Sequence, residues 1–174
     1  MTGSRSIPRL VLFSGPPGTG KSTLSYALSR ATGWAVIAKD GLDRTLESRS
    51  ADPWSPLIAY HLMLGIADLN LRQGTSIILD AVFGRVDFRR QVSAMAAQHG
   101  ARFHAVVCHC GDAMLWQQRV EERPEMISGW TPADWAEARR SAASFEPWAD
   151  PHLLLDAADP LTFNLDLLLQ QVTA

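Results

Sequence analysis

A glycine-rich segment near the N-terminus carries the most specific chemical pattern in the chain. Residues 15–22 are Gly-Pro-Pro-Gly-Thr-Gly-Lys-Ser and match G-x-x-x-x-G-K-[ST] at every fixed position. In this pattern the glycines let backbone N–H groups face a phosphate, the lysine neutralises the β- and γ-phosphates, and the serine hydroxyl binds Mg²⁺. The segment therefore predicts a site for a nucleoside triphosphate with Mg²⁺. The expected contacts are Gly15, Pro17, Gly18, Thr19, Gly20, Lys21, Ser22 and Thr23, with Lys21 also catalytic and Ser22 a metal ligand.

Two aspartates follow apolar segments that have the character of buried strands. Asp40 comes after residues 35–38, and Asp80 comes after residues 77–79. On a strand next to the phosphate-binding loop, Asp40 can accept the proton of an acceptor hydroxyl and orient that hydroxyl for in-line attack on the γ-phosphorus. Asp80 suits a carboxylate that binds Mg²⁺ directly or through water. For each aspartate, capping of the following turn is the alternative.

The residues after Asp80 argue against two classes of nucleotide hydrolase. Ala81 stands where many motor ATPases carry a glutamate that activates water. The chain contains no Asn-Lys-x-Asp sequence for guanine, and Asp80 to Gly84 is one residue too long for D-x-x-G. We therefore expect neither a hydrolytic motor nor a GTPase.

Two arginines lie four residues apart near the end of a predicted helix. Arg119 and Arg123 share one face of that helix, and a break in the helical pattern follows at Pro124. A short segment between two helices is typical of a lid, here about residues 123–131. The arginines of such a lid can stabilise the charge on a phosphoryl group during its transfer. A solvated helix end is the alternative.

The elements that must position these residues alternate along the chain. Apolar runs predict strands at residues 10–14, 35–38, 77–79, 103–108 and 153–155. Helical spacing predicts helices at 21–31, 56–72, 85 to about 98 and 112 to about 123. A further helix is expected with Thr131 as N-cap, Pro132 at N1 and Asp134 at N3. A last helix should follow Pro160, with Leu161, Leu165, Leu168 and Val172 on its inner face.

This alternation predicts an α/β fold with a five-stranded parallel sheet covered by helices on both faces. Right-handed crossovers bring the carboxyl end of every strand to one edge of the sheet. Ligands bind at that edge in α/β proteins, so the loop at 15–22, Asp40 and Asp80 should meet there.

Composition and charge exclude several other classes. The chain has 174 residues, 47% of them hydrophobic, with a net charge of -2. We expect one domain over residues 1–174, without a membrane span and without the basic surface that nucleic-acid binding requires. Cys108 and Cys110 are expected to be ordinary strand residues, because His109 between them points to the opposite face of the strand. The absence of a disulfide framework and of a targeting segment favours the cytoplasm.

The motifs together resemble the small P-loop kinases. GPPGTGKST, Lys39-Asp40, LDAVF and the Arg-x-x-x-Arg pair occur in the order typical of these proteins. The resemblance is closest to the AAA-type small kinases, which are related to chloramphenicol phosphotransferase, gluconate kinase, zeta toxins and polynucleotide 5′-kinase domains. It implies Mg-ATP as the phosphoryl donor, Asp40 as the base and Arg119 and Arg123 as lid arginines. It also implies that Asp40, Arg44 and Asp80 contact the acceptor, although Asp43 stands where many relatives carry a basic residue.

The predicted function is therefore ATP-dependent transfer of a phosphoryl group to a hydroxyl of a small molecule. A nucleotide kinase or a polynucleotide 5′-kinase is one alternative, and a non-catalytic ATP-binding regulatory module is another. The sequence leaves the acceptor and the oligomeric state open. Four aromatic residues either line an acceptor pocket or pack in the core, namely Trp54, Tyr60, Phe83 and Trp130.

Overall fold

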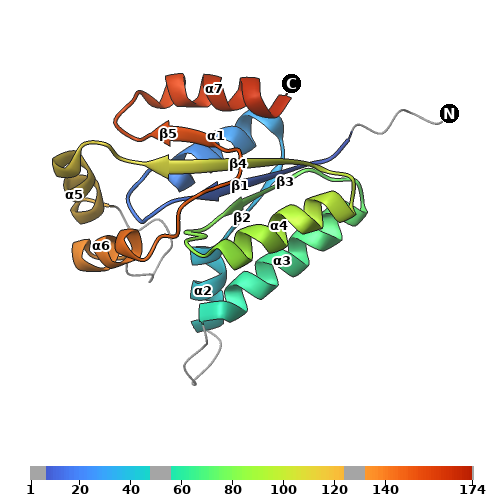
Figure 1. Ribbon diagram of the computed structural model, residues 1–174, viewed down its shortest axis with the longest axis horizontal. Helices are drawn as coiled ribbons and strands as arrows, with labels where there is room; N and C mark the ends of the chain where they lie inside the picture. Colours follow the sequence, from blue (N-terminus) through green and yellow to red (C-terminus); the bar gives the residue numbers. More distant parts are fainter. Residues whose placement is uncertain (1–6, 48–55, 124–131, 174) are drawn as a thin grey trace.

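A five-stranded parallel sheet forms the centre of the molecule (Figure 1). The computed structural model describes residues 7–47, 56–123 and 132–173. The strands lie in the order β2-β3-β1-β4-β5. They are β1 (Arg9–Ser14), β2 (Ala35–Ala38), β3 (Ile77–Asp80), β4 (Arg102–His109) and β5 (Leu153–Asp156). The predicted α/β fold with five parallel strands is confirmed.

Helices cover both faces of this sheet and one of its edges. Helices α1 and α7 pack on one face and α3 and α4 on the other, while α5 and α6 lie beyond the carboxyl ends of the strands (Figure 1). The bounds are α1 (Lys21–Thr32), α2 (Lys39–Glu47), α3 (Pro56–Arg72), α4 (Val86–Gln98), α5 (Ala113–Glu121), α6 (Trp135–Ala143) and α7 (Leu161–Thr173). Within the described ranges, none of the helices has the length and apolar character of a membrane-spanning segment.

The central strands are apolar at successive positions because both of their faces are buried. On β1, Leu10 and Leu12 belong to the apolar cluster under α3 and α4. Val11 and Phe13 belong to the cluster under α1 and α7. This alternation gives the sheet two separate cores, one on each face.

The order of the strands corrects one expectation about Asp40. From the sequence, the strand at 35–38 is expected to lie next to the strand that leads into the phosphate-binding loop. In the structure β3 lies between them, since β2 pairs only with β3. Asp40 therefore belongs to the outer side of the site, and Asp80 stands between it and the loop.

Helix α2 was not predicted from the sequence. It starts at Lys39, directly after β2, contains no fully buried residue, and carries only two large apolar residues, Leu42 and Leu46, one turn apart. An ion pair between Lys39 and Asp43 at 2.5 Å links successive turns, and Leu42 packs against the cluster under α3. Asp40 consequently lies in the first turn of a helix and not in a loop.

Helix α6 starts later than predicted. Asp134 is its N-cap, where its Oδ1 accepts a hydrogen bond from the Glu137 N–H at 2.7 Å. The Glu137 carboxylate accepts one from the Asp134 N–H at 3.1 Å, which completes a capping box. The assignment of Pro132 to N1 and of Asp134 to N3 is therefore wrong, and Thr131 lies outside the described residues.

The inner face of α7 is also shifted from the prediction. Asn164, Leu168 and Val172 are its buried residues, whereas Leu161 is 43% exposed. The Asn164 amide donates a hydrogen bond to the carbonyl of Asp156 at 2.7 Å. This bond explains why a polar residue occupies an inward position that hydrophobic periodicity alone assigns to leucine.

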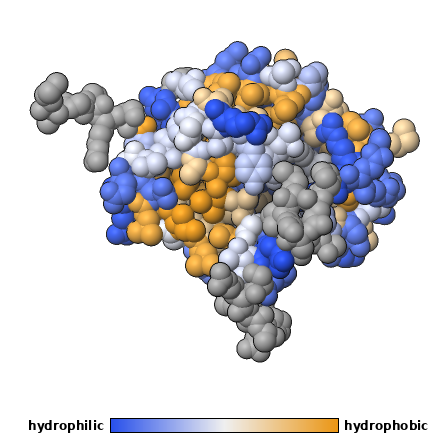
Figure 2. Space-filling model, turned by 180° about the vertical axis from the view of Figure 1, so that it is seen from behind, coloured by the Kyte–Doolittle hydropathy of each residue, from blue (hydrophilic) through white to orange (hydrophobic). Residues whose placement is uncertain are grey.

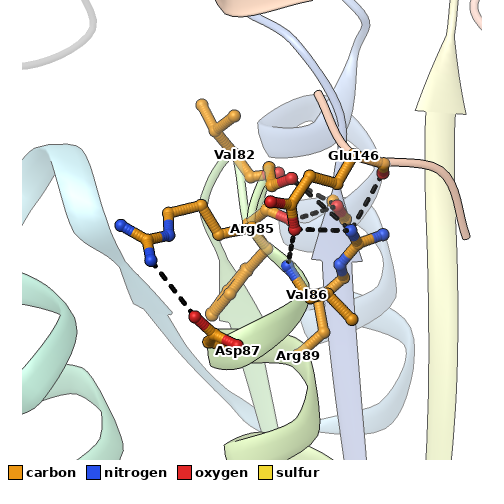
Figure 3. A network of polar contacts seen from close by, with 9 residues as sticks. Val82, Arg85, Val86, Asp87, Arg89 and Glu146 are labelled. Carbon is orange, nitrogen blue, oxygen red and sulfur yellow. Dashed lines mark hydrogen bonds and ion pairs between the residues drawn. The ribbon is translucent and has the colours of Figure 1, made fainter. Parts of the chain in front are cut away.

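The chain segment that follows α6 is bound tightly to the loop after β3 (Figure 3). Arg89 of α4 is only 4% exposed and donates to the Glu146 carbonyl at 2.9 Å, between the rings of Phe145 and Trp148. The Glu146 carboxylate accepts from the Val86 N–H at 2.5 Å. These contacts fix the return from α6 to the sheet against the start of α4.

On the molecular surface, large apolar residues occur in separate groups. Figure 2 shows such groups at the top and at the lower left of one face, among hydrophilic residues. The large apolar side chains that are exposed are Ile7, Leu57, Leu62, Leu69, Met114, Leu154, Leu161 and Phe163.

Replacement of Arg89 should destabilise the fold strongly. The change Arg89→Met removes a buried guanidinium from a carbonyl and from two aromatic rings, so we expect a loss of about 2–4 kcal/mol in the free energy of unfolding. Urea denaturation measures it. Arg90→Met, at an exposed position of the same helix, is the control and should cost under about 0.5 kcal/mol. Equal losses in both variants would contradict the structural role of Arg89.

Candidate active site

A cavity of about 550 Å³ opens at the carboxyl edge of the sheet. The loop between β1 and α1 borders it, as do the ends of β2, β3 and β5 and the end of α5. Its charged and hydroxyl lining residues are Lys21, Ser22, Thr23, Tyr26, Asp40, Asp80, Arg119, Glu122, Arg123 and Asp159. Most of the site residues expected from three strand ends and one helix therefore meet in a single cavity.

The P-loop, residues 15–22, is shaped by a close contact at its first residue. Gly15 has a φ of +141°, and a Cβ atom there would clash with the carbonyl oxygen of Cys108. Its N–H donates to the carbonyl of Val82 at 3.1 Å, which joins the loop to the segment after β3. Only glycine meets both conditions.

Helix α1 begins at the end of this loop and presents its N-terminus to the cavity. Its N-cap, Gly20, is left-handed and has no side chain to cap the first backbone N–H groups. Uncapped N–H groups and the positive end of the helix dipole favour an anion at this position. The cavity lining also includes Gly20, Ser22 and Thr23 from this turn.

The ammonium group of Lys21 lies largely out of solvent. Its Nζ donates to the carbonyl of Pro16 at 2.8 Å, and the residue is 9% exposed. Burial lowers the pKa of Lys21, and the nearby Asp80 carboxylate opposes that effect. A phosphate in the loop would give this cation a second anionic partner.

Asp80 ends β3 at the floor of the cavity, close to Ser22. Burial raises the pKa of Asp80, while Lys21 and hydrogen bonds from Ser22 and Ser25 oppose the rise. The Ser25 hydroxyl donates to Asp80 Oδ2 at 3.1 Å. Ser22 and Asp80, each expected to bind Mg²⁺, line the same cavity, and together they fit a divalent cation whose other ligands are phosphate oxygens and water. The described residues contain no group of three acidic, histidine or cysteine side chains that would hold a metal without such ligands.

Asp40 and Arg123 close the cavity on the β2 side. Arg123 follows directly after α5, and its Nη2 lies 3.4 Å from Asp40 Oδ2. About half of the Asp40 side chain is exposed. It is therefore held in place by a cation and still open to a molecule in the cavity.

Arg119 points to the opposite end of the cavity. Its guanidinium donates a hydrogen bond to the carbonyl of Ala157, just after β5. The P-loop follows the central strand β1, and the cavity extends from it toward β2 on one side and toward β5 on the other. We call the part lined by Ala38, Asp40, Ala81 and Val82 the β2 side, and the part lined by Ala157, Asp159, Leu161 and Asn164 the β5 side.

Three of the expected contact residues lie outside the cavity lining: Gly15, Thr19 and Arg44. Thr19 is buried and its hydroxyl donates to the Pro16 carbonyl at 2.8 Å, so it shapes the loop. Arg44 lies in the last turn of α2, one turn beyond Asp40. Most of the proposed lid, residues 124–131, is outside the described residues.

The aromatic residues that were weighed as an acceptor pocket belong to the core where the structure describes them. Phe83 is fully buried, and Tyr60 stacks on Phe88 with ring centroids 4.5 Å apart. The Tyr60 hydroxyl accepts a hydrogen bond from the Phe83 N–H at 3.2 Å, and burial raises the pKa of Tyr60 to about 12. Trp54 and Trp130 lie outside the described residues.

Sequence reasoning missed two residues of α1. Ser25 supports Asp80, and Tyr26 lines the cavity. Both follow Ser22 by one helical turn, at i+3 and i+4, so the face of the predicted helix that carries Ser22 could have identified them. Cys108 agrees with its prediction as a strand residue in the core, whereas the assignment of Cys110 to the strand is wrong, because β4 ends at His109 and Cys110 is half-buried after it.

Comparisons with known proteins agree with this geometry. A family model described as an AAA domain matches residues 10–147. Over 129 residues the chain is 29% identical to a cytidylate kinase from Shewanella sediminis, covering 68% of this chain and 54% of that protein. The chain spans about half the length of this relative, and between 8% and 20% of the other curated relatives that it matches.

Solved structures with the same fold include two kinases. The APS kinase of Mycobacterium tuberculosis in complex with AMPPNP and APS has a TM-score of 0.71 at 17% identity, covering 97% of this chain and 99% of that chain. A gluconokinase from Sinorhizobium meliloti 1021 has a TM-score of 0.69 at 17% identity, covering 97% of this chain and 94% of that chain. The molecule thus has the P-loop NTPase fold found in these kinases.

The burial of Asp80 should make stability depend on pH. Because the pKa of Asp80 is raised above its ordinary value of 3.8, the native state keeps a proton that the unfolded chain releases as the pH rises from 3.8. The free energy of unfolding should therefore fall with rising pH, by at most about 1.4 kcal/mol per pH unit, until the pH passes the raised pKa.

The variant Asp80→Asn lacks this titration and serves as the reference. Urea denaturation of both proteins between about pH 3.5 and about pH 7 gives the wild-type value minus the variant value at each pH. We expect this difference to decrease as the pH rises. An increase would show that the attraction of Lys21 outweighs burial.

Proposed function

The chain belongs to the AAA-domain family, and from this membership, from the fold that it shares with small kinases and from the geometry of the cavity we propose that it transfers the γ-phosphoryl group of Mg-ATP to a hydroxyl of a small molecule. One observation carries the proposal. The Asp40 carboxylate borders the same cavity as the P-loop lysine, Ser22 and Asp80. A carboxylate for the acceptor and groups for the phosphates are thus within one site.

The donor nucleotide would lie along the P-loop, with its nucleoside on the β5 side. Lys21 and the N-terminus of α1 suit the phosphates, and Arg119 is held by Ala157 at the nucleoside end. Ser22 and Asp80 would hold Mg²⁺, which neutralises phosphate charge when it is bound. The side chains of Lys21, Asp80 and Arg119 already make hydrogen bonds within the protein, so they would need little movement to contact the nucleotide and the metal.

The acceptor would lie on the β2 side, next to Asp40. Its hydroxyl oxygen attacks the γ-phosphorus, the bond from that phosphorus to the bridging oxygen breaks, and ADP leaves. Asp40 accepts the hydroxyl proton, and Arg123 keeps the carboxylate in position. Catalysis then depends on positioning and on neutralisation of charge by Lys21 and the two arginines.

The acceptor is identified by a screen for ADP release. Purified protein with Mg-ATP is incubated with neutral hydroxylated metabolites, nucleosides, nucleotides and oligonucleotides that carry a 5′-hydroxyl. We expect stimulation by a small hydroxylated compound. Stimulation by nucleotides or oligonucleotides alone would replace the small-molecule acceptor by the corresponding kinase class. ATP binding without stimulation by any class would favour a regulatory module.

Replacement of Asp40 should separate binding from transfer. The change Asp40→Asn removes the proton acceptor and keeps the shape of the side chain, so we expect kcat to fall by about 10²- to 10⁴-fold. The Kd for ATP should change little. Asp43→Asn, on the same helix and paired with Lys39 outside the cavity lining, is the matched control and should retain activity. An Asp40→Asn protein with normal kcat would exclude Asp40 as the base.

The two arginines should affect different kinetic parameters. Arg119→Met is expected to raise the KM for ATP about 5- to 20-fold, because its guanidinium lies at the nucleoside end of the cavity. Arg123→Met should mainly lower kcat, since it releases the Asp40 carboxylate. Steady-state kinetics with both substrates varied tests this division. The same change of KM and kcat in both variants would contradict it.

A further inference from the structure

Trp116 of α5 holds a backbone carbonyl of the P-loop. Its indole Nε1–H donates to the carbonyl oxygen of Pro17 at 2.8 Å, across 99 residues of sequence. Asp112 fixes the start of α5 by accepting hydrogen bonds from the N–H groups of Met114 and Leu115 at 2.9 and 3.0 Å. The indole therefore comes from a capped helix and reaches the loop from its outer side.

We propose that Trp116 is a positioning residue that turns the N–H of Gly18 toward a bound β-phosphate. The inference rests on the proposed function. The carbonyl of Pro17 and the N–H of Gly18 belong to one planar trans peptide unit, so they point in opposite directions. Because Trp116 of α5 holds the Pro17 carbonyl on the outer side of the loop, the Gly18 N–H is directed toward the cavity. Both Pro17 and Gly18 line this cavity.

The composition of the loop makes this one N–H important. Pro16 and Pro17 have no backbone N–H to offer a phosphate. The N–H of Gly15 already donates to the carbonyl of Val82. Gly18 is consequently the first residue of the loop whose N–H can donate a hydrogen bond to a ligand. The orientation of this N–H decides whether the first half of the P-loop contributes a donor to the phosphate.

Gly18 is also the residue whose peptide unit can turn most easily. Its φ is +80°, a conformation in which glycine meets little resistance to rotation. A Cβ atom at this position would lie 3.2 Å from the Trp116 Nε1 and would clash with Val120. Helix α5 therefore packs directly on the glycine, and the indole bond selects one of the orientations that glycine permits.

A second tryptophan holds the indole in place. Trp135, the first residue of α6, contacts Trp116 edge to face with ring centroids 4.7 Å apart. Trp116, Arg119 and Val120 follow at i, i+3 and i+4, so they share one face of α5. The face that orients Gly18 thus also carries Arg119, which lines the cavity.

The change Trp116→Phe tests the proposal because it keeps an aromatic ring and removes the N–H. We expect the Kd for ADP, measured by isothermal titration calorimetry, to rise about 5- to 10-fold. The Kd for adenosine should stay the same, since adenosine has no β-phosphate. Trp148→Phe is the matched control: its indole N–H is buried and has no hydrogen-bond partner among the described residues, so this change should leave both affinities unaltered.

Two results with a folded Trp116→Phe protein would overturn the proposal. One is wild-type affinity for ADP, and the other is an equal loss for ADP and adenosine, which would reduce Trp116 to a packing role. Failure of the wild-type protein to bind ADP or ATP would instead reject the proposed function. This failure is distinguishable, because it appears before any substitution is made.

Nuclear magnetic resonance of the wild-type protein provides a test that does not depend on folding of the variant. With ¹⁵N-labelled tryptophan, the indole signal of Trp116 is assigned by replacing the other tryptophans one at a time. We expect ADP to shift this signal and adenosine to leave it in place. A signal that responds equally to both ligands, or to neither, would overturn the proposal.

Discussion

The buried pair of Lys21 and Asp80 is the constraint on which the rest of the site depends. Burial disfavours the charged form of each, lowering the pKa of the lysine and raising that of the aspartate. Each charge partly offsets the cost of the other, and Ser22 and Ser25 add hydrogen bonds to the carboxylate. This arrangement requires β1 and β3 to be neighbours, because one strand leads to the lysine and the other ends in the aspartate. The strand order and the polar face of α1 thus serve one electrostatic requirement.

Backbone contacts then fix the segments around this pair. The carbonyl of Val82 accepts hydrogen bonds from both the Ser14 hydroxyl and the Gly15 N–H, so the loop after β3 and the P-loop form one unit. On the other side of that loop, Gly84 accepts from the Glu146 N–H, and Arg89 holds the Glu146 carbonyl. The segment that returns from α6 is thereby connected to the floor of the cavity. Local structure at three distant parts of the sequence depends on these few bonds.

The sequence predicts the parts of the fold that local chemistry determines. The strands are continuous apolar runs, and the P-loop motif identifies Lys21 and Ser22 directly. Helix α2 was not found in the same way, because it is short and its apolar face consists of a single pair of leucines, Leu42 and Leu46. The position of β3 between β1 and β2 depends on pairing between distant segments, which no local pattern contains. The contact from Trp116 to Pro17 is hidden for the same reason, since its partners lie 99 residues apart.

The close approach of β4 to the P-loop has a consequence for the redox chemistry of the molecule. The carbonyl of Cys108 occupies the space that a side chain at Gly15 would need, and its thiol is 1% exposed. Burial raises the pKa of the Cys108 thiol to about 12, so almost no thiolate is present at neutral pH. An electrophile or oxidant would reach the half-buried Cys110 first. The Cys108 thiol belongs to the core under α1 and α7, so it becomes reactive only when these helices unpack from the sheet, which makes it an internal marker of that packing.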